Sequence, residues 1–318
     1  MNKILVALFT LLVLHASAHA ADKIRIGVPE FNAQFVPLAL AEKRGFFRED
    51  GLEGEVIRIN PTVALAALVS GELDYWTVIG NSVGAAIHGM PLRVAACFVP
   101  GSPSALIARP EFKSVQELKG KAIGLNTSGG ALESTGRLIF KHFGLDPDKE
   151  IKFLPLGTSE RRLAAMKQGL TAATLGSPPL DLLGKKMGFV VLARAHELFS
   201  YPTSGVVASV KKIKENPEEI KRVIKAGIKA TRYIRQNREG TIQIMMELTK
   251  ADKEMATAGY ESVLKAFNDD GGVPEKGLLL VIDELKKLSK VEREISLSDV
   301  ADLSMLREAQ KERGITAR

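Results

Sequence analysis

Residues 68–82 read LVSGELDYWTVIGNS, and residues 166–177 read MKQGLTAATLGS. In each stretch a helical pattern ends at a glycine, Gly71 or Gly169, and a short apolar strand then runs into a turn of small and hydroxyl residues. The elements around the two glycines follow the same order, with a spacing of about 97 residues along the chain. This internal repeat predicts two lobes of similar design.

Strands alternate with helices in both copies of the repeat. The first copy predicts a helix after residue 81, helices at 37–43 and 62–70, and strands at 23–28, 55–59, 75–79 and 92–99. The second copy predicts helices at 131–143 and 159–168 and strands at 121–125, 151–156 and 171–175. Because this alternation is typical of parallel strands, we expect an α/β fold with a mostly parallel sheet, flanked by helices, in each lobe.

The last third of the chain has a largely helical pattern. A strand at 205–210 precedes helical segments at 218–236, 240–248, 253–267 and 278–289. If this tail packs back on the first lobe, the chain crosses between the lobes twice, near 104–109 and near 203–210, and two crossings form a hinge. The predicted division is lobe 1 at 21–107, lobe 2 at 108–204, and a return to lobe 1 at 205–318.

Residues 1–20 have the order of a secretory signal peptide. Lys3 gives a positive start, residues 4–14 are apolar apart from Thr10, and Ala18-His19-Ala20 is a small-x-small cleavage site. The apolar run is shorter than the roughly 20 residues that span a bilayer. An apolar N-terminal strand or anchor is the alternative. We expect cleavage after Ala20 and export to the periplasm, without a lipid anchor because no cysteine stands directly after the cleavage site.

Charge and cysteine content narrow the class of protein. The net charge is +7, or +6 without Lys3, and acidic and basic residues are mixed throughout. The most basic stretches, 211–214 and 286–290, lack the interleaved aromatic side chains that bind single-stranded nucleic acids, so nucleic-acid binding is not expected. Cys97 is the only cysteine, which excludes a disulfide within the chain, and its apolar surroundings at 94–99 predict a buried thiol.

Four turns, at residues 30–35, 80–82, 126–130 and 176–178, follow predicted strands. They lie at the carboxyl ends, where open α/β sheets bind ligands. Each combines small or hydroxyl residues with a helix start, whose free N–H groups suit an oxyanion or a carbonyl oxygen. Ordinary helix capping is the alternative for any single turn. Convergence of four turns on one cleft favours binding by Glu30, Phe31, Asn32, Gln34, Phe35, Asn81, Ser82, Thr127, Ser128, Gly129, Gly130 and Ser177.

Three larger side chains are further candidates for ligand contact. Trp76, the only tryptophan, precedes the second turn and either stacks on a ligand or fills the core. Tyr201, with the phenylalanines of the first turn, would favour an aromatic or other unsaturated acid. Arg161, at the start of a predicted helix, either neutralises an anionic ligand or lies on a solvated helix face.

One motif suggests an enzyme. Residues 80–84, GNSVG, fit the G-x-S-x-G nucleophile elbow between a strand and a helix. Only three histidines follow residue 20: His88 lies six residues after Ser82 on the same predicted helix, and His142 and His196 fall in the other lobe. A serine hydrolase using Ser82 is therefore an alternative without an evident base.

Other catalytic and metal motifs are incomplete. Residues 124–130 have the glycine spacing of a phosphate-binding loop, but Gly130 stands where that motif has lysine. Three scattered histidines and one cysteine do not form a metal-ligand pattern. We therefore expect no catalytic residue, no metal and no cofactor.

Several segments, taken in order, resemble a known family. They include 26–27 (IG), 35–38 (FVPL), 41–47 (AEKRGFF), 50–52 (DGL), 68–74 (LVSGELD) followed by Gly80 and Ser82, 118–124 (LKGKAIG) and 163–169 (LAAMKQG). Together they resemble the nitrate/sulfonate/taurine-type substrate-binding proteins of ABC importers, whose fold family includes a thiamine-pyrimidine synthase. The resemblance covers nearly all of the chain after residue 20.

The resemblance implies a two-lobed periplasmic-binding-protein fold of the second type, with the ligand held between the lobes. It implies binding positions at 30–35, Asn81, Ser82, 127–130 and Ser177. The acidic Glu30 departs from what a sulfonate or nitrate pocket would favour. Pyrimidine-precursor binders share the family fold, whereas the synthase would require a cysteine cluster that this chain does not have.

The sequence thus predicts an extracytoplasmic solute-binding protein, a monomer, that delivers its ligand to an ABC permease with its ATPase. The expected ligand is a small polar or anionic organic molecule of the sulfonate, taurine, nitrate, pyrimidine or carboxylate class. The ligand would bias a hinge by its differential affinity for the closed form. The alternatives are the hydrolase using Ser82 and a ligand-binding module of a sensor.

Overall fold

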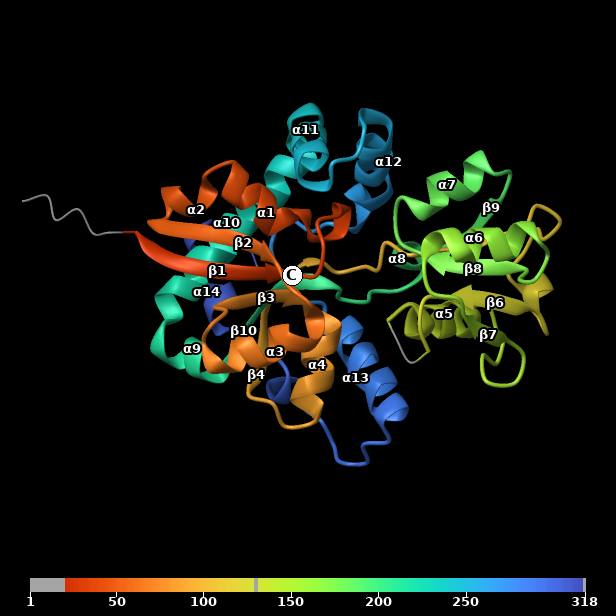
Figure 1. The fold of residues 1–318 in the computed structure, drawn as a ribbon. Helices are drawn as coiled ribbons and strands as arrows, with labels where there is room; N and C mark the ends of the chain where they lie inside the picture. Colours follow the sequence, from red (N-terminus) through yellow and green to blue (C-terminus); the bar gives the residue numbers. More distant parts are fainter. Residues whose placement is uncertain (1–20, 129–130, 317–318) are drawn as a thin grey trace, which may run out of the picture.

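The computed structural model describes residues 21–128 and 131–316. The predicted signal peptide and its cleavage site lie outside these residues. Figure 1 shows two α/β lobes side by side, each built around a sheet of five strands. Within the described residues, no helix has both the length and the apolar character needed to cross a membrane.

Sheet A forms the first lobe and contains the first four strands and the last one. Its order is β2-β1-β3-β10-β4. Strand β1 is parallel to β2 and β3, whereas β10 is antiparallel to both β3 and β4. The bounds are β1 Asp22–Val28, β2 Leu52–Arg58, β3 Tyr75–Val78, β4 Leu92–Val99 and β10 Ser204–Ser209.

Sheet B forms the second lobe and repeats this arrangement with the order β7-β6-β8-β5-β9. Strand β6 is parallel to β7 and β8, and β5 is antiparallel to β8 and β9. The predicted fold class is therefore confirmed, although β9 was not predicted. The bounds are β5 Ala105–Ala108, β6 Ala122–Leu125, β7 Lys152–Pro155, β8 Ala173–Gly176 and β9 Val190–Arg194.

Helices flank both sheets (Figure 1). Those before β10 are α1 Val36–Lys43, α2 Phe46–Glu49, α3 Pro61–Ser70, α4 Ile79–Ile87, α5 Ala131–His142, α6 Ser159–Lys167, α7 Leu180–Lys186 and α8 Ala195–Leu198. Those after β10 are α9 Val210–Glu215, α10 Pro217–Gln236, α11 Arg238–Thr249, α12 Lys253–Val263, α13 Glu275–Ser289 and α14 Ser304–Glu312. Gly71 and Gly169, which mark the repeat, have φ angles of +84° and +76° just after α3 and α6, a backbone conformation that glycine adopts without strain.

The core of lobe 1 lies on both faces of sheet A, and side chains of the helices after β10 pack into it. On one face α10 begins with Pro217 and two glutamates that favour a helix N-terminus, and it buries an apolar stripe against the sheet. Side chains of α1, α11 and α12 join the same core cluster. The opposite face carries α3, α4 and α13, represented by Leu68, Val83 and Val281.

Two short segments connect the lobes. Residues 100–104 leave β4 for β5, and residues 199–203 lead into β10. Hydrogen bonds tie the segments together: Tyr201 N donates to Pro100 O at 2.8 Å, and Thr203 N donates to Val99 O at 2.9 Å. The crossings were predicted near 104–109 and 203–210, but most of those residues form β5 and β10 inside the sheets. The residue limits predicted for the lobes stay a prediction.

We predict that Gly205→Ala destabilises the protein. Gly205 lies in β10 opposite Cys97, and a Cβ at this position would overlap the backbone carbonyl oxygen of Ala96 in β4. Because β4 cannot move without disturbing its pairing, we expect the free energy of unfolding to fall by about 1–3 kcal/mol. Urea denaturation measures this difference.

Gly84→Ala is the matched control. Gly84 lies inside α4, and its Cβ would lie 3.8 Å from Leu285 Cδ1, an ordinary van der Waals contact. Since alanine favours a helix over glycine by about 1 kcal/mol, this variant should be as stable as the wild type or more stable. Equal stability of the two variants would contradict the close approach of β10 to β4.

Candidate functional site

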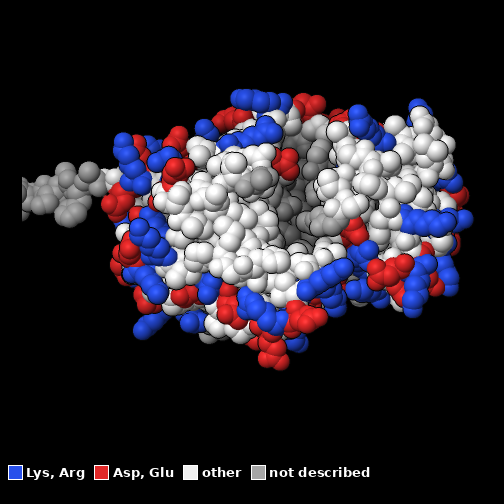
Figure 2. All heavy atoms as spheres, turned by 60° about the horizontal axis from the view of Figure 1, so that its bottom comes forward, with Lys and Arg blue, Asp and Glu red and all other residues white. Residues whose placement is uncertain are grey.

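A cavity of about 900 Å³ lies between the two lobes, and Figure 2 shows the surface hollowed there. Lobe 1 contributes the loop after β1 and parts of α11 and α12 with the turn between them. Lobe 2 contributes residues that follow β6, β7 and β8. The cavity therefore lies at the carboxyl ends of parallel strands in both sheets, the position at which open α/β sheets bind ligands.

The first predicted turn reaches the cavity through four residues, Glu30, Phe31, Asn32 and Ala33. The Asn32 side chain accepts hydrogen bonds from the backbone N–H groups of Gln34 and Phe35 at 2.9 and 3.2 Å and donates to Glu30 Oε1 at 2.7 Å. Asn32 thus fixes the loop and orients the Glu30 carboxylate. Phe35 is buried in the core of lobe 1, and neither it nor Gln34 is among the described residues that line the cavity.

The second predicted turn is the first turn of a helix, because α4 begins at Ile79. Trp76 is completely buried in the core and donates from Nε1 to Asn81 Oδ1 at 3.0 Å. Ser82, 2% exposed, donates from Oγ to Val78 O at 2.8 Å. None of these three side chains lines the described cavity. Ligand contact by them stays a prediction.

The third predicted turn follows β6. Asn126 lines the cavity, and its Oδ1 accepts a hydrogen bond from Thr127 N at 2.8 Å. Thr127 and Ser128 are exposed and are not among the described lining residues. The predicted binding residues Gly129 and Gly130 lie outside the described residues.

The fourth predicted turn links the cavity to the first crossing. Ser177 lines the cavity, and its hydroxyl lies 3.2 Å from the Ser104 hydroxyl. Ser104 Oγ also accepts a hydrogen bond from Ser102 Oγ at 3.1 Å. Since Ser102 and Ser104 are buried in the crossing, the three hydroxyl groups connect the cavity wall to the hinge.

Arg162 lines the cavity, whereas its neighbour Arg161 is not among the described lining residues, so ligand contact by Arg161 stays a prediction. Arg161 is exposed, whereas Arg162 is 4% exposed and lies in the cavity wall. Its Nη1 donates to Gly157 O at 2.9 Å and its Nη2 to Ser159 Oγ at 3.1 Å. Burial lowers the pKa of the Arg162 guanidinium from its usual value. Helical spacing could have found it, because Arg162 precedes the buried Met166 by four residues on one face of α6.

Tyr201 lies at the second crossing and is 4% exposed. It packs in an apolar cluster that includes Leu138 of α5 and residues of α13. Burial raises the pKa of its hydroxyl to about 12. Tyr201 is not among the described lining residues of the cavity, so its contact with a ligand stays a prediction.

The lobes touch on both sides of the cavity. On one side Lys141 of α5 donates to Glu284 of α13 at 2.9 Å, and the Glu284 side chain is 5% exposed. On the other side Lys186 of α7 pairs with Glu254 of α12 at 2.7 Å. Figure 1 shows the two helix pairs that these contacts join, α5 with α13 and α7 with α12.

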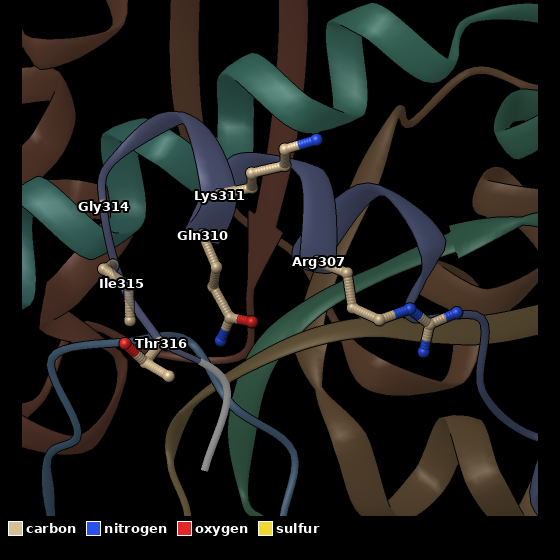
Figure 3. Close-up of a pocket in the computed structure, with 6 residues that line it drawn as sticks. All are labelled: Arg307, Gln310, Lys311, Gly314, Ile315 and Thr316. Atoms are coloured by element: carbon tan, nitrogen blue, oxygen red, sulfur yellow. The ribbon is translucent and has the colours of Figure 1, made fainter.

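Another cavity, of about 410 Å³, lies along α14 and the segment after it. Figure 3 shows that the Arg307 side chain extends away from Ile315 and Thr316. The Gln310 amide is bonded to Asp270 O at 2.9 Å. Lobe 2 contributes none of the described lining residues, so hinge motion would not enclose a ligand there. The described part of the chain also holds no cluster of three or more His, Cys, Asp or Glu side chains suited to a metal ion.

Two α/β lobes joined by two crossings, with a cavity between them, define a periplasmic-binding-protein fold. A family model described as NMT1/THI5 like matches residues 32–240, and the chain belongs to this family. A Brucella abortus (strain 2308) protein described as a binding protein is 28% identical over 258 residues, which cover 79% of this chain and 75% of that protein.

Solved structures share the fold at low sequence identity. The periplasmic sulfonate-binding protein SsuA from Methylobacillus flagellatus KT has a TM-score of 0.76 at 15% identity, covering 94% of this chain and 96% of its own. The desulfurization enzyme DSZB has a TM-score of 0.65 at 13% identity, covering 92% and 99%. Because one fold carries a binding protein and an enzyme, function has to be inferred from the site.

We predict that Ser82→Ala abolishes no esterase activity. The Ser82 hydroxyl is buried and donates to a backbone carbonyl within α4, and His88 follows it at the exposed end of that helix. Loss of one buried hydrogen bond should lower the free energy of unfolding by about 1 kcal/mol. Hydrolysis of p-nitrophenyl acetate by wild type and variant measures the activity. Esterase turnover that the substitution abolishes would establish the hydrolase instead.

Proposed function

We propose that this protein is the solute-binding component of an ABC importer and captures a small polar or anionic organic molecule between its lobes. The observation that carries the proposal is the cavity at the carboxyl ends of strands from both sheets. Membership of the NMT1/THI5-like family and the binding-protein relative support it. The lobe limits at residues 107 and 204 form part of the proposal.

The mechanism follows from the two crossings. Because residues 100–104 and 199–203 are short and bonded to each other, the lobes rotate about a single line through them. A ligand that contacts both walls binds the closed form more tightly than the open form and shifts the population toward it. A permease with its ATPase would recognise the closed form at the membrane. We place the protein in the periplasm as a monomer, after cleavage behind Ala20.

The site favours binding over catalysis. Ser82, the nucleophile of the hydrolase alternative, is held inside α4 and does not line the described cavity. Asn32 and Asn126 contact the cavity and hydrogen-bond to groups of their own loops, which suits a rigid wall. A sensor module would use the same closure. Genes for a permease and an ATPase next to the gene for this protein would indicate transport rather than sensing.

We predict that a bound ligand stabilises and compacts the protein that begins at Ala21. Candidate ligands are alkanesulfonates, taurine, nitrate, aromatic carboxylates, pyrimidines and common amino acids. At 100 times its dissociation constant a ligand adds about 2.7 kcal/mol to the free energy of unfolding, which raises the melting temperature by several degrees. Small-angle scattering with the same compound should show a smaller radius of gyration, since closure brings the lobes together.

Each measurement controls the other. A compound that raises the melting temperature without compaction binds away from the hinge and contradicts the closing mechanism. If no compound acts, native mass spectrometry of protein purified from its own periplasm identifies a co-purified solute. The absence of any bound solute there, together with a negative panel, would refute the proposed function.

A further inference from the structure

Among the described residues, no carboxylate is hydrogen-bonded to the buried guanidinium of Arg162 in the cavity wall, although the exposed Glu160 attracts it electrostatically. Arg162 is 4% exposed, its two bonded nitrogens meet only a carbonyl and a hydroxyl, and its Nε has no hydrogen-bond partner. Other shielded arginines of lobe 2 are paired with carboxylates, Arg137 with Glu133 at 2.9 Å and Arg194 with Asp181 at 2.7 Å. A buried charge is stable when it is paired, so the Arg162 environment is incomplete without an anion.

The helix that carries Arg162 adds to this preference. Arg162 lies in the first half of α6, whose cap, Thr158, and first residue, Ser159, both line the cavity. The N-terminus of a helix stabilises negative charge. Glu160, the acidic residue in this turn, is exposed, and hydrogen bonds from its own N–H and from Thr158 lower the pKa of its carboxyl group. Glu160 is therefore bonded within the first turn of α6 and, among the described residues, forms no salt bridge with Arg162, although the two charges attract each other.

The remaining charges limit the anion to a single negative charge. Glu30 and Asp252 line the lobe 1 wall, Glu160 lies on the lobe 2 wall, and Lys250 is the other basic lining residue. These four side chains are exposed, so among the described lining residues only Arg162 offers a desolvated positive charge. A second anionic group on the ligand would face carboxylates and be repelled.

The cavity also provides apolar surface. Its volume of about 900 Å³ lies in the range of sites for organic ligands and greatly exceeds the volume of a nitrate ion. Apolar side chains come from both lobes, so a ligand body between the walls would be desolvated on two sides. They are Phe31, Leu132, Leu180, Leu183, Met245 and Met255.

We propose that Arg162 binds the carboxylate or sulfonate of a monoanionic organic acid whose apolar body, a ring or a short chain, packs between the two walls. This inference rests on the proposed function, because it assigns the substrate class of the same cavity. The acid group pairs with the guanidinium beside the N-terminus of α6. The apolar body contacts Phe31 and the methionines of lobe 1 when the hinge closes.

The test uses acids with their neutral amides and two neighbouring arginines. The probes are benzoate, benzenesulfonate and hexanoate, with benzamide, benzenesulfonamide and hexanamide as isosteres. Titration calorimetry compares the wild type, Arg162→Gln and the control Arg161→Gln, which removes an exposed charge from the same helix. We expect at least one acid to bind and its amide not to. Arg162→Gln should weaken the acid about 30-fold or more, and Arg161→Gln less than threefold.

Arg162→Lys keeps the charge but not the planar donor fork, so it should bind with intermediate affinity and guards against misfolding of the glutamine variant. Circular dichroism establishes that each variant is folded. Equal binding of the acid to Arg162→Gln and Arg161→Gln would overturn the inference, as would equal binding of acid and amide. If taurine, nitrate or a neutral solute binds in the cleft and none of the acids does, the inference fails while the proposed function stands.

Discussion

The double crossing between the lobes is the constraint on which the rest of the structure depends. Residues 100–104 and 199–203 run beside each other, and backbone hydrogen bonds from Tyr201 and Thr203 hold them together. The first crossing leads into β5 and the second into β10. Each of these strands is the fourth in the order of its sheet and runs antiparallel to its neighbours. The strands that end at the cavity are β1, β6, β7 and β8, and they are thereby directed toward the gap between the lobes. One connection would leave the lobes free to twist, whereas two restrict them to opening and closing.

Much of the fold could be predicted because the internal repeat contains residues that the backbone conformation requires at particular positions. Gly71 and Gly169 end helices with positive φ, and alternation of strands and helices specifies parallel sheets. The predicted fold class is confirmed. The positions of β5 and β10 within the sheets were harder to predict from the sequence. Each of these strands pairs with strands that are distant in the sequence, and such pairing depends on the tertiary structure. Strand β9 escaped prediction because its residues, VVLAR at 190–194, are a short apolar run without alternation.

The site was predictable only at the level of loops. Glu30, Phe31, Asn32 and Ser177 were expected at strand ends and do line the cavity. Asn81 and Ser82 were expected in a turn at the cavity, but they are not among its described lining residues. Helix α4 begins at Ile79, before this turn, so the two side chains are hydrogen-bonded to Trp76 and Val78 within lobe 1. The choice between Arg161 and Arg162 depended on helix phase. Successive side chains of an α-helix point in directions about 100° apart around the helix axis. The charge of Arg161 is therefore solvated and that of Arg162 is buried.

The two lobes would play different roles in ligand binding, because the buried charge of the cavity wall lies in lobe 2. Arg162 and its two partners, Gly157 and Ser159, all belong to the segment after β7, so the guanidinium keeps its orientation whatever the hinge angle. An acid group can therefore bind lobe 2 before closure. In the proposed mechanism, lobe 1 then contributes Phe31, the methionines and exposed carboxylates of the cavity wall, which would discriminate between ligands by their shape and by excess charge. Closure consequently depends on the body of the ligand more than on its acid group. An anion without an apolar body would bind the guanidinium with similar affinity in the open and closed forms. Such an anion would therefore not shift the population toward the closed form.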